Sequence, residues 1–112
     1  MAKFGSLFLH NGRVGDKQVV PEEWVSLSTH RHVSTTNGFD YGYQWWRFRG
    51  GSDIANLLRT NDAFFAWGYG GQFVFVFPHL NLVVVTTAGN FTDSSPAFRY
   101  LRDYILQAVK DR

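Results

Sequence analysis

Residues 67–72 form the stretch whose composition is best suited to chemistry. They read WGYGGQ and lead directly into an apolar run that is typical of a strand. Three glycines within four residues allow close backbone approach and positive φ angles, and such a strand start can direct backbone N–H groups at an oxyanion. A glycine-rich bulge or turn explains the same composition without chemistry, and composition alone favours that simpler interpretation.

Other residues with reactive side chains form no clear site. His30 and His32 lie two positions apart in a polar stretch with no third ligand, which indicates a surface more than half a metal site. His10 and His79 are isolated, and we expect both to be exposed. The spacing of the aspartates requires no catalytic pair, so we expect turn formers at Asp40, Asp53, Asp62 and Asp93.

The composition is that of one small globular domain spanning residues 1–112. Hydrophobic residues make up 45% and charged residues 18%, a balance that argues against disorder. Eleven Lys and Arg stand against nine Asp and Glu, without a basic stripe that could follow a phosphate backbone. No apolar run approaches the ~20 residues of a membrane span. Cysteine is absent, which excludes disulfides and Cys-ligated zinc. We therefore expect no cofactor, no nucleic acid and no membrane span.

The spacing of apolar residues predicts the helices that position these side chains. Intervals of three and four predict helices over residues 2–10 and 98–110. Pro21 followed by two glutamates predicts the start of another helix, which should end near residue 28. Residues 29–38 are expected to form a loop, and residues 54–58 a single helical turn or a lid.

The remaining apolar segments predict strands. Residues 41–48 and 64–67 are each expected to form one strand. Residues 72–77 and 81–87 should pair as an antiparallel hairpin around a turn at residues 78–80. The predicted fold class is α+β, with an antiparallel sheet of about three strands packed by a C-terminal helix and short N-terminal helices.

The predicted hairpin is apolar on both faces. Residues 73–77 alternate Phe and Val, and residues 82–85 read LVVV, so neither strand presents a polar face to water. The C-terminal helix can cover one face, but the short N-terminal helices must cover the other alone. We therefore expect that the chain is a fragment of a larger fold, an oligomer, or both.

Several ordered segments resemble the C-terminal part of the β-lactamase-related serine hydrolases. That family includes class C β-lactamases, penicillin-binding proteins, esterases and 6-aminohexanoate-dimer hydrolase. The matching segments keep the family's order and spacing, and the resemblance as a whole covers nearly all of the chain. They are residues 1–7 (MAKFGSL), 20–25 (VPEEWV), 41–46 (YGYQWW), 63–78 (AFFAWGYGGQFVFVFP), 82–85 (LVVV) and 88–90 (AGN).

The resemblance implies a partial β-lactamase/transpeptidase-like fold and an assignment for the glycine-rich stretch. It places the family's third motif, often Lys-Thr-Gly or His-Thr-Gly, near residues 66–68. The backbone amide of Tyr69 then becomes the candidate oxyanion donor, with substrate contacts at Trp46, Trp67, Gly68 and Gly70. The motif's cation is missing here, a departure that resembles the esterase and amide-hydrolase branches more than the true β-lactamases.

The family's nucleophile is absent from this sequence. It is the serine of an S-x-x-K motif, and none of the serines here is followed by lysine three positions later. The resemblance implies that the intact enzyme cleaves a small ester or amide through an acyl-serine intermediate in the bacterial cytoplasm or periplasm. We expect this chain alone to be inactive, and to need the missing N-terminal portion or self-association.

Two further function classes stay open. The chain could be a small aromatic-rich binding module with a ligand near Trp45, Trp46 or Trp67. In adjacent tryptophans, however, one ring more often enters the core and the other forms a groove wall. The chain could also be an oligomeric structural protein without catalysis, in which another copy covers the two-sided hairpin.

Overall fold

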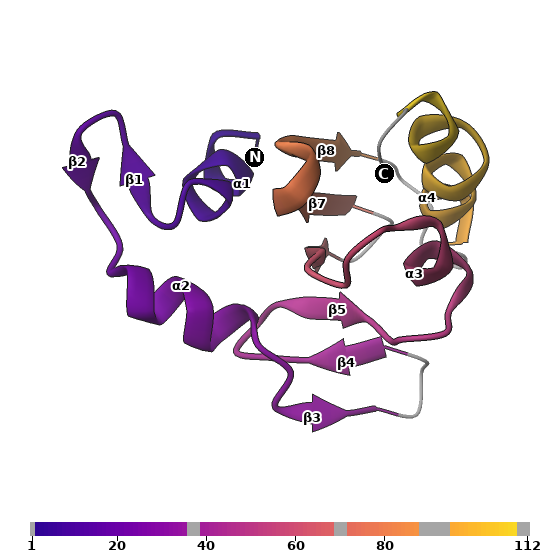
Figure 1. Ribbon diagram of the computed structural model, residues 1–112, viewed down its shortest axis with the longest axis horizontal. Helices are drawn as coiled ribbons and strands as arrows, with labels where there is room; N and C mark the ends of the chain where they lie inside the picture. The colour runs from indigo at the N-terminus through magenta and orange to yellow at the C-terminus, as the bar shows by residue number, and fades with distance from the viewer. Residues whose placement is uncertain (1, 36–38, 69–71, 88–94, 110–112) are drawn as a thin grey trace.

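The computed structural model describes residues 2–35, 39–68, 72–87 and 95–109 (Figure 1). Its centre is a six-stranded antiparallel sheet in which every strand pairs with the next along the chain. The strands are β3 (Val33–Ser34), β4 (Phe39–Tyr41), β5 (Trp46–Phe48), β6 (Phe64–Gly68), β7 (Gln72–Phe77) and β8 (Leu82–Thr86). The α+β class is confirmed, but the sheet is wider than the predicted three strands.

The additional strands come from segments that sequence reasoning interpreted differently. Residues 41–48 are not one strand, because the Gly42 N–H donates to the Trp45 carbonyl at 2.7 Å and closes a turn between β4 and β5. Gln44 in this turn has a φ of 71°. Any Cβ on Gly42 would collide with the Ser28 carbonyl oxygen, so the turn requires glycine there. The predicted loop before β4 also contains the two-residue strand β3.

The helices lie close to their predicted positions. They are α1 (Ala2–Leu9), α2 (Glu22–Thr29), α3 (Asp53–Leu57) and α4 (Ser95–Tyr100), the last continued by a π-helical turn (Leu101–Ile105) and a 3₁₀ turn (Leu106–Ala108). A small hairpin of β1 (Arg13–Val14) and β2 (Lys17–Gln18) joins α1 to α2. Asn11 and Gly12 end α1 with φ angles of 58° and 86°, the left-handed stop that their residue types predict. None of the helices among the described residues is long and apolar enough to cross a membrane.

Each face of the sheet has its own core, as the two-sided hairpin predicts. On one face the phenylalanines of β7 pack with Leu101 and Leu106 beneath the C-terminal helix. On the other face Val74 and Val76 pack with Phe8 of α1 and other residues. Figure 1 shows the sheet between α1 and α2 on one side and α3 and α4 on the other. The chain therefore supplies a covering layer for both faces.

This cover is thinner over β8, the last strand in sheet order. All five residues of β7 from Phe73 to Phe77 are buried, whereas every residue of β8 is only half-buried. No strand of the described residues lies beyond β8. The predicted shortage of covering material is thus concentrated at this edge of the sheet.

Candidate active-site groove beside strand β6

The second half of β6 has a free edge. β5 pairs only with the first two residues of β6, Phe64 and Phe65. β7 pairs with β6 along the whole length of β6. Residues 66–68 therefore have no strand partner on the β5 side among the described residues. Backbone groups on such an edge are available to an extended ligand.

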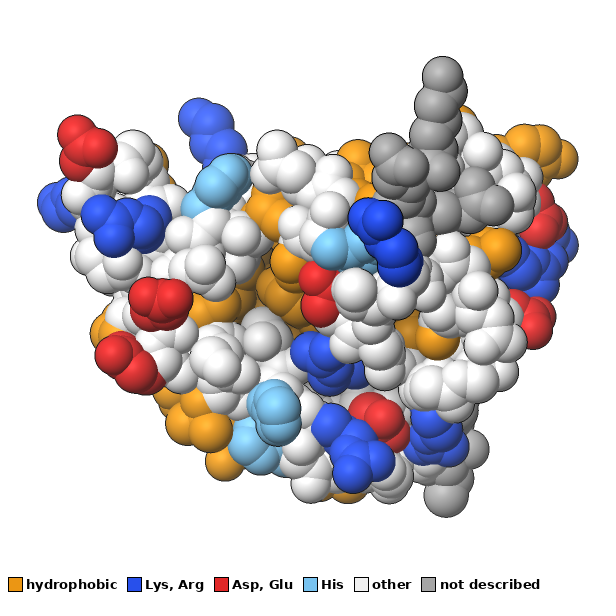
Figure 2. Space-filling model, viewed as in Figure 1, with side chains coloured by type: hydrophobic (Ala, Val, Ile, Leu, Met, Phe, Trp, Pro, Cys, Tyr) orange, Lys and Arg blue, Asp and Glu red, His pale blue; other side chains and the backbone are white. Residues whose placement is uncertain are grey.

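A groove follows this free edge on the face that α1 covers. It consists of two adjoining hollows with volumes of about 460 and 570 Å³, which share Phe4, Gln44 and Ala66. We call it the β6 groove, and it extends from Gly68 at one end to Trp24 at the other. The described residues that line it include no charged side chain. In Figure 2, apolar side chains are visible at the surface of a hollow between the α1–α2 part of the molecule and the rest.

Gln44 lies where the two hollows meet. It is exposed, and its positive φ is uncommon for a residue other than glycine. Backbone strain of this kind is concentrated at functional sites. Sequence reasoning missed Gln44, because nothing in YGYQWW marks the one position that the turn forces into the left-handed region.

The structure brings two of the predicted site residues together. The rings of Trp46 and Trp67 lie 5.6 Å apart at 64°. Both side chains pack against the core beneath the C-terminal helix, and the Trp67 ring stacks on Phe73 at 5.5 Å. Trp67 thus borders the groove while its ring lies on the other face of the sheet. Trp45 is buried on the groove side, so the adjacent tryptophans lie on opposite faces.

The remaining predicted site residues lie at or beyond the end of β6. Gly68 is exposed, borders the groove, and pairs with Gln72 across β6 and β7. Tyr69 and Gly70 lie outside the described residues. The assignment of the Tyr69 amide as the oxyanion donor therefore stays a prediction.

His79 is not the isolated, exposed residue that its sequence context predicts. Its side chain is only 12% exposed, and its Nδ1 lies 2.7 Å from Asp62 Oδ1. The backbone N–H of His79 also donates to Asp62 Oδ2 at 3.0 Å. Asp62 thereby joins the entry of β6 to the turn between β7 and β8. His79 Nε2 is buried without a hydrogen-bond partner among the described residues, and Nδ1 faces Asp62, so neither ring nitrogen is open to a substrate, although the Asp62 side chain is 35% exposed.

Two arginines, one in β5 and one just after it, connect neighbouring segments of the chain through hydrogen bonds. Arg47 donates to the carbonyl oxygens of Thr29 and Asn61, and so satisfies the C-terminal end of α2. Burial lowers the pKa of Arg47 despite the nearby Asp62 and Asp40, but arginine starts so far above neutrality that it stays charged.

Arg49 binds Asp40 at 3.3 Å, and Asp40 is a buried strand residue and not the turn former that its residue type predicts. Among the described residues, no three His, Asp or Glu side chains gather closely enough to hold a metal ion.

Comparison with known proteins identifies the fold. No family model and no curated protein sequence matches the chain. A penicillin-binding protein homologue from Caulobacter crescentus matches 80% of the chain with a TM-score of 0.62 and 15% identity. A Bacillus anthracis protein that carries the provisional description 6-aminohexanoate-dimer hydrolase matches 93% with a TM-score of 0.64 and 26% identity. The chain has part of the β-lactamase-related serine hydrolase fold.

The resemblance that the sequence motifs indicate is thereby confirmed at the level of the fold. The chain spans about a quarter of the length of these two structures, 25% and 26% respectively. The β-lactamase-related fold is present here as one sheet with a helical layer on either face. The β6 groove lies beside residues 66–68 of β6, which have no β5 partner among the described residues.

Proposed function

We propose that this chain forms the sheet wall of the active site in a serine hydrolase that cleaves an ester or amide through an acyl-serine intermediate. The observation that supports this proposal is the free edge of β6 at residues 66–68, which borders a groove and leads into the glycine-rich residues 68–71. An unpaired strand edge can bind extended substrate through its backbone, and glycine permits the close approach that this requires.

In the proposed mechanism the chain supplies binding and electrostatics, and the nucleophile comes from elsewhere. A serine oxygen attacks the substrate carbonyl carbon, and the carbonyl oxygen gains negative charge. The Tyr69 amide would donate a hydrogen bond to that oxygen, a contribution whose loss typically lowers kcat by about 10²–10³. Because no serine here begins an S-x-x-K motif, we propose that the nucleophile lies on a segment outside these 112 residues.

The lining of the groove narrows the proposed substrate class. It offers exposed polar side chains at Gln44 and Gln72, and none of the described residues that line it is charged. A substrate carboxylate beside the scissile bond would find no cation on this wall. We therefore propose a neutral ester or amide in this part of the site, which favours the esterase and amidase branches over β-lactamases.

The test is covalent labelling followed by intact mass measurement. The purified 112-residue chain is incubated with a fluorophosphonate, an activated ester and a fluorescent β-lactam, and no adduct or turnover is expected. The longer polypeptide encoded by the same reading frame should gain one fluorophosphonate on the serine of an S-x-x-K segment. A stoichiometric adduct on the 112-residue chain, or a reading frame without such a segment, would contradict the proposal.

A binding module is the second candidate, and one observation favours it. Trp24 and Tyr43 are each 46% exposed and stack at 5.9 Å on the rim of the β6 groove. His32 stacks on Tyr43 at 4.1 Å. Any sugar or peptide site would then use these rings in preference to Trp45, which is buried. A saturable change in tryptophan fluorescence with an oligosaccharide, abolished in Trp24→Ala, would support this alternative.

A further inference from the structure

A second pocket opens on the other face of the sheet, between α3 and the C-terminal helix. Its volume is about 340 Å³, at the lower end of the range of about 300–1,000 Å³ for small-molecule sites. Among the described residues, it shares no lining residue with the β6 groove. An inference about this pocket therefore does not depend on the proposed hydrolase function.

The inner part of the pocket is a preformed apolar slot. Phe48 and Ile54 are 1% and 6% exposed and belong to the core beneath the C-terminal helix. Phe39 and Phe98 are half-buried and stack on each other at 5.2 Å with 21° between their planes. Because core packing holds these rings, the slot can accept a flat or branched apolar group without rearrangement.

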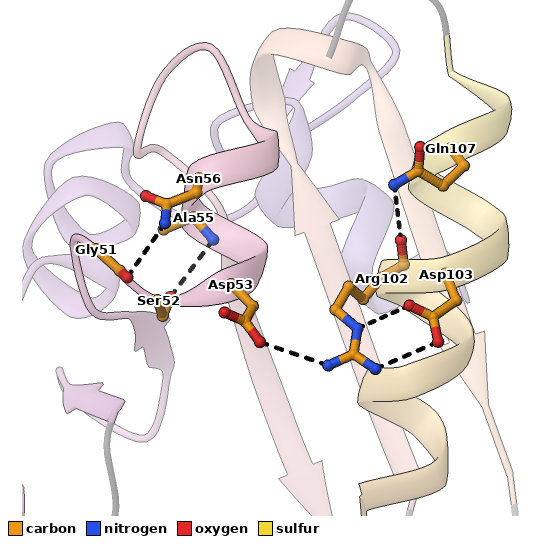
Figure 3. A network of polar contacts seen from close by, with 8 residues as sticks. All are labelled: Gly51, Ser52, Asp53, Ala55, Asn56, Arg102, Asp103 and Gln107. Carbon is orange, nitrogen blue, oxygen red and sulfur yellow. Dashed lines mark hydrogen bonds and ion pairs between the residues drawn. The ribbon is translucent and has the colours of Figure 1, made fainter.

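The opening of the pocket carries two guanidinium groups. Arg102 makes a paired contact with Asp103, from Nε at 2.7 Å and from Nη2 at 3.2 Å. Its third donor, Nη1, reaches Asp53 at only 3.5 Å, and the Asp53 side chain is 80% exposed. Figure 3 shows Arg102 extending from the C-terminal helix toward Asp53 at the start of α3. A contact this long to an exposed carboxylate is weak and exchangeable.

Arg99 provides the other guanidinium group of the opening. It lies three residues before Arg102, so the two side chains emerge from the same side of the helix. No described residue forms a hydrogen bond or an ion pair with Arg99. Among the described residues, one wall of the apolar slot thus presents Arg99, which acts on Asp103 only through the electrostatic field, and Arg102, whose Nη1 is held only by the long contact to Asp53.

We propose that this pocket binds a small monocarboxylate with an aromatic or branched aliphatic body. The carboxylate bridges Arg99 and Nη1 of Arg102 in place of the long contact to Asp53, and the body enters the slot above Phe48 and Ile54. Arginine is the side chain best suited to carboxylate because its planar fork presents paired donors. The nearby carboxylates of Asp53 and Asp103 oppose a second negative charge, so a monoanion fits better than a dianionic phosphate.

The test is an NMR titration of the ¹⁵N-labelled chain with 3-phenylpropionate. We expect saturable shifts at Ile54 and around Arg99, with a Kd on the order of 1 mM for a ligand of this size. The uncharged analogue 3-phenylpropan-1-ol and the dianion phenylphosphonate should each bind at least about tenfold more weakly. The double variant Arg99→Gln/Arg102→Gln should lose a similar factor. Arg13→Gln, at an exposed arginine of β1, should bind like the unchanged chain.

The variants change the exposed Arg13 and Arg99 and the half-buried surface residue Arg102, none of which belongs to the core, so they should keep the amide spectrum of the folded chain. The proposal is overturned if the alcohol binds as tightly as the acid, or if the double variant retains full affinity. It is also overturned if the shifts map to Gln44 and Ala66 in the β6 groove, or if phenylphosphonate binds more tightly than 3-phenylpropionate.

Discussion

Asp62 accepts two hydrogen bonds from His79, one from the ring and one from the backbone, across 17 residues of chain. Asp62→Ala removes both bonds and leaves the backbone N–H of His79 without its acceptor. His79→Ala removes the ring bond and keeps the backbone bond. It also removes the buried Nε2, which has no hydrogen-bond partner among the described residues. We therefore expect Asp62→Ala to cost about 1–3 kcal/mol of unfolding free energy, and His79→Ala to cost less.

Urea denaturation monitored by tryptophan fluorescence measures both variants and the double variant. Asp16→Ala, at an exposed position between β1 and β2, is the control and should change stability by no more than about 0.5 kcal/mol. The double variant should show a coupling between Asp62 and His79 of at least about 0.5 kcal/mol. Equal costs for the two single variants would contradict the role given to the backbone bond.

Gly5 of α1 should resist the substitution that usually stabilises a helix. Alanine at an exposed helical glycine gains about 1 kcal/mol. At Gly5, however, the added Cβ would lie 2.7 Å from Cγ1 of Val83 and 2.8 Å from Cγ1 of Val74. Because α1 must move away from the sheet, we expect Gly5→Ala to lower the unfolding free energy by about 1–3 kcal/mol.

Gly50→Ala is the matched control for Gly5→Ala, since a Cβ at Gly50 meets nothing within 4 Å. It should be neutral or slightly stabilising in thermal unfolding. Removing the obstructing methyl groups in the double variant Gly5→Ala/Val83→Ala should restore part of the loss, beyond what the two single changes predict together. A stabilised Gly5→Ala chain would contradict the observed packing of α1 on β8.

The left-handed backbone conformation of Gln44 predicts that glycine stabilises the chain at this position, although glycine usually destabilises an element. Glycine inside an element normally costs roughly 0.5–1 kcal/mol, and we expect that loss for Gln72→Gly in β7. At Gln44, with φ at 71°, glycine removes the steric penalty of that conformation. Gln44→Gly should therefore raise the unfolding free energy by about 0.5–1 kcal/mol. If both variants lose stability equally in urea, the turn does not hold Gln44 in this conformation.

The fold could be predicted from the sequence wherever local pattern and burial agree. Residues 72–77 and 82–86 read as a hairpin because their apolar, β-branched composition leaves no alternative, and Pro21 marks the start of α2. The turn at Gly42 was missed because aromatic residues continue through it without a typical turn pair. It is fixed by tertiary contact, since the Tyr43 N–H donates to the Ser28 carbonyl.

Part of the candidate site could likewise be predicted from the sequence and part could not. The family resemblance predicts Trp67 and Gly68 as site residues, and both line the β6 groove. Their contact with a substrate stays a prediction. Gln44 and the Asp62–His79 pair were not predicted, because their environments are assembled from segments far apart in the chain. The pocket lined by Arg99 and Arg102 likewise depends on how α3 packs against the C-terminal helix.

The edge strand β8 predicts self-association of the 112-residue chain. Its side chains are apolar from Leu82 to Val85, half-buried on both faces, and free of the charges and prolines that protect natural edges. We expect sedimentation velocity to show dimers or larger species at micromolar concentration. Val85→Lys should shift the chain toward monomer, whereas Val19→Lys, at an exposed valine outside the sheet, should not. A strictly monomeric unchanged chain would exclude the oligomeric structural function.

Gly68 allows a test of the β6 groove in the longer polypeptide that the proposed function requires. A Cβ at Gly68 lies 3.4 Å from Cβ of Gln72, so Gly68→Ala should fold. Gly68→Val places a branched side chain on the free edge where substrate backbone is proposed to lie. We expect Gly68→Val to lower kcat/KM for an activated ester by about tenfold or more, and Gly50→Val to have little effect. Unchanged ester hydrolysis in a folded Gly68→Val enzyme would contradict a close approach of the substrate to β6 at Gly68, where a branched side chain would project into the β6 groove.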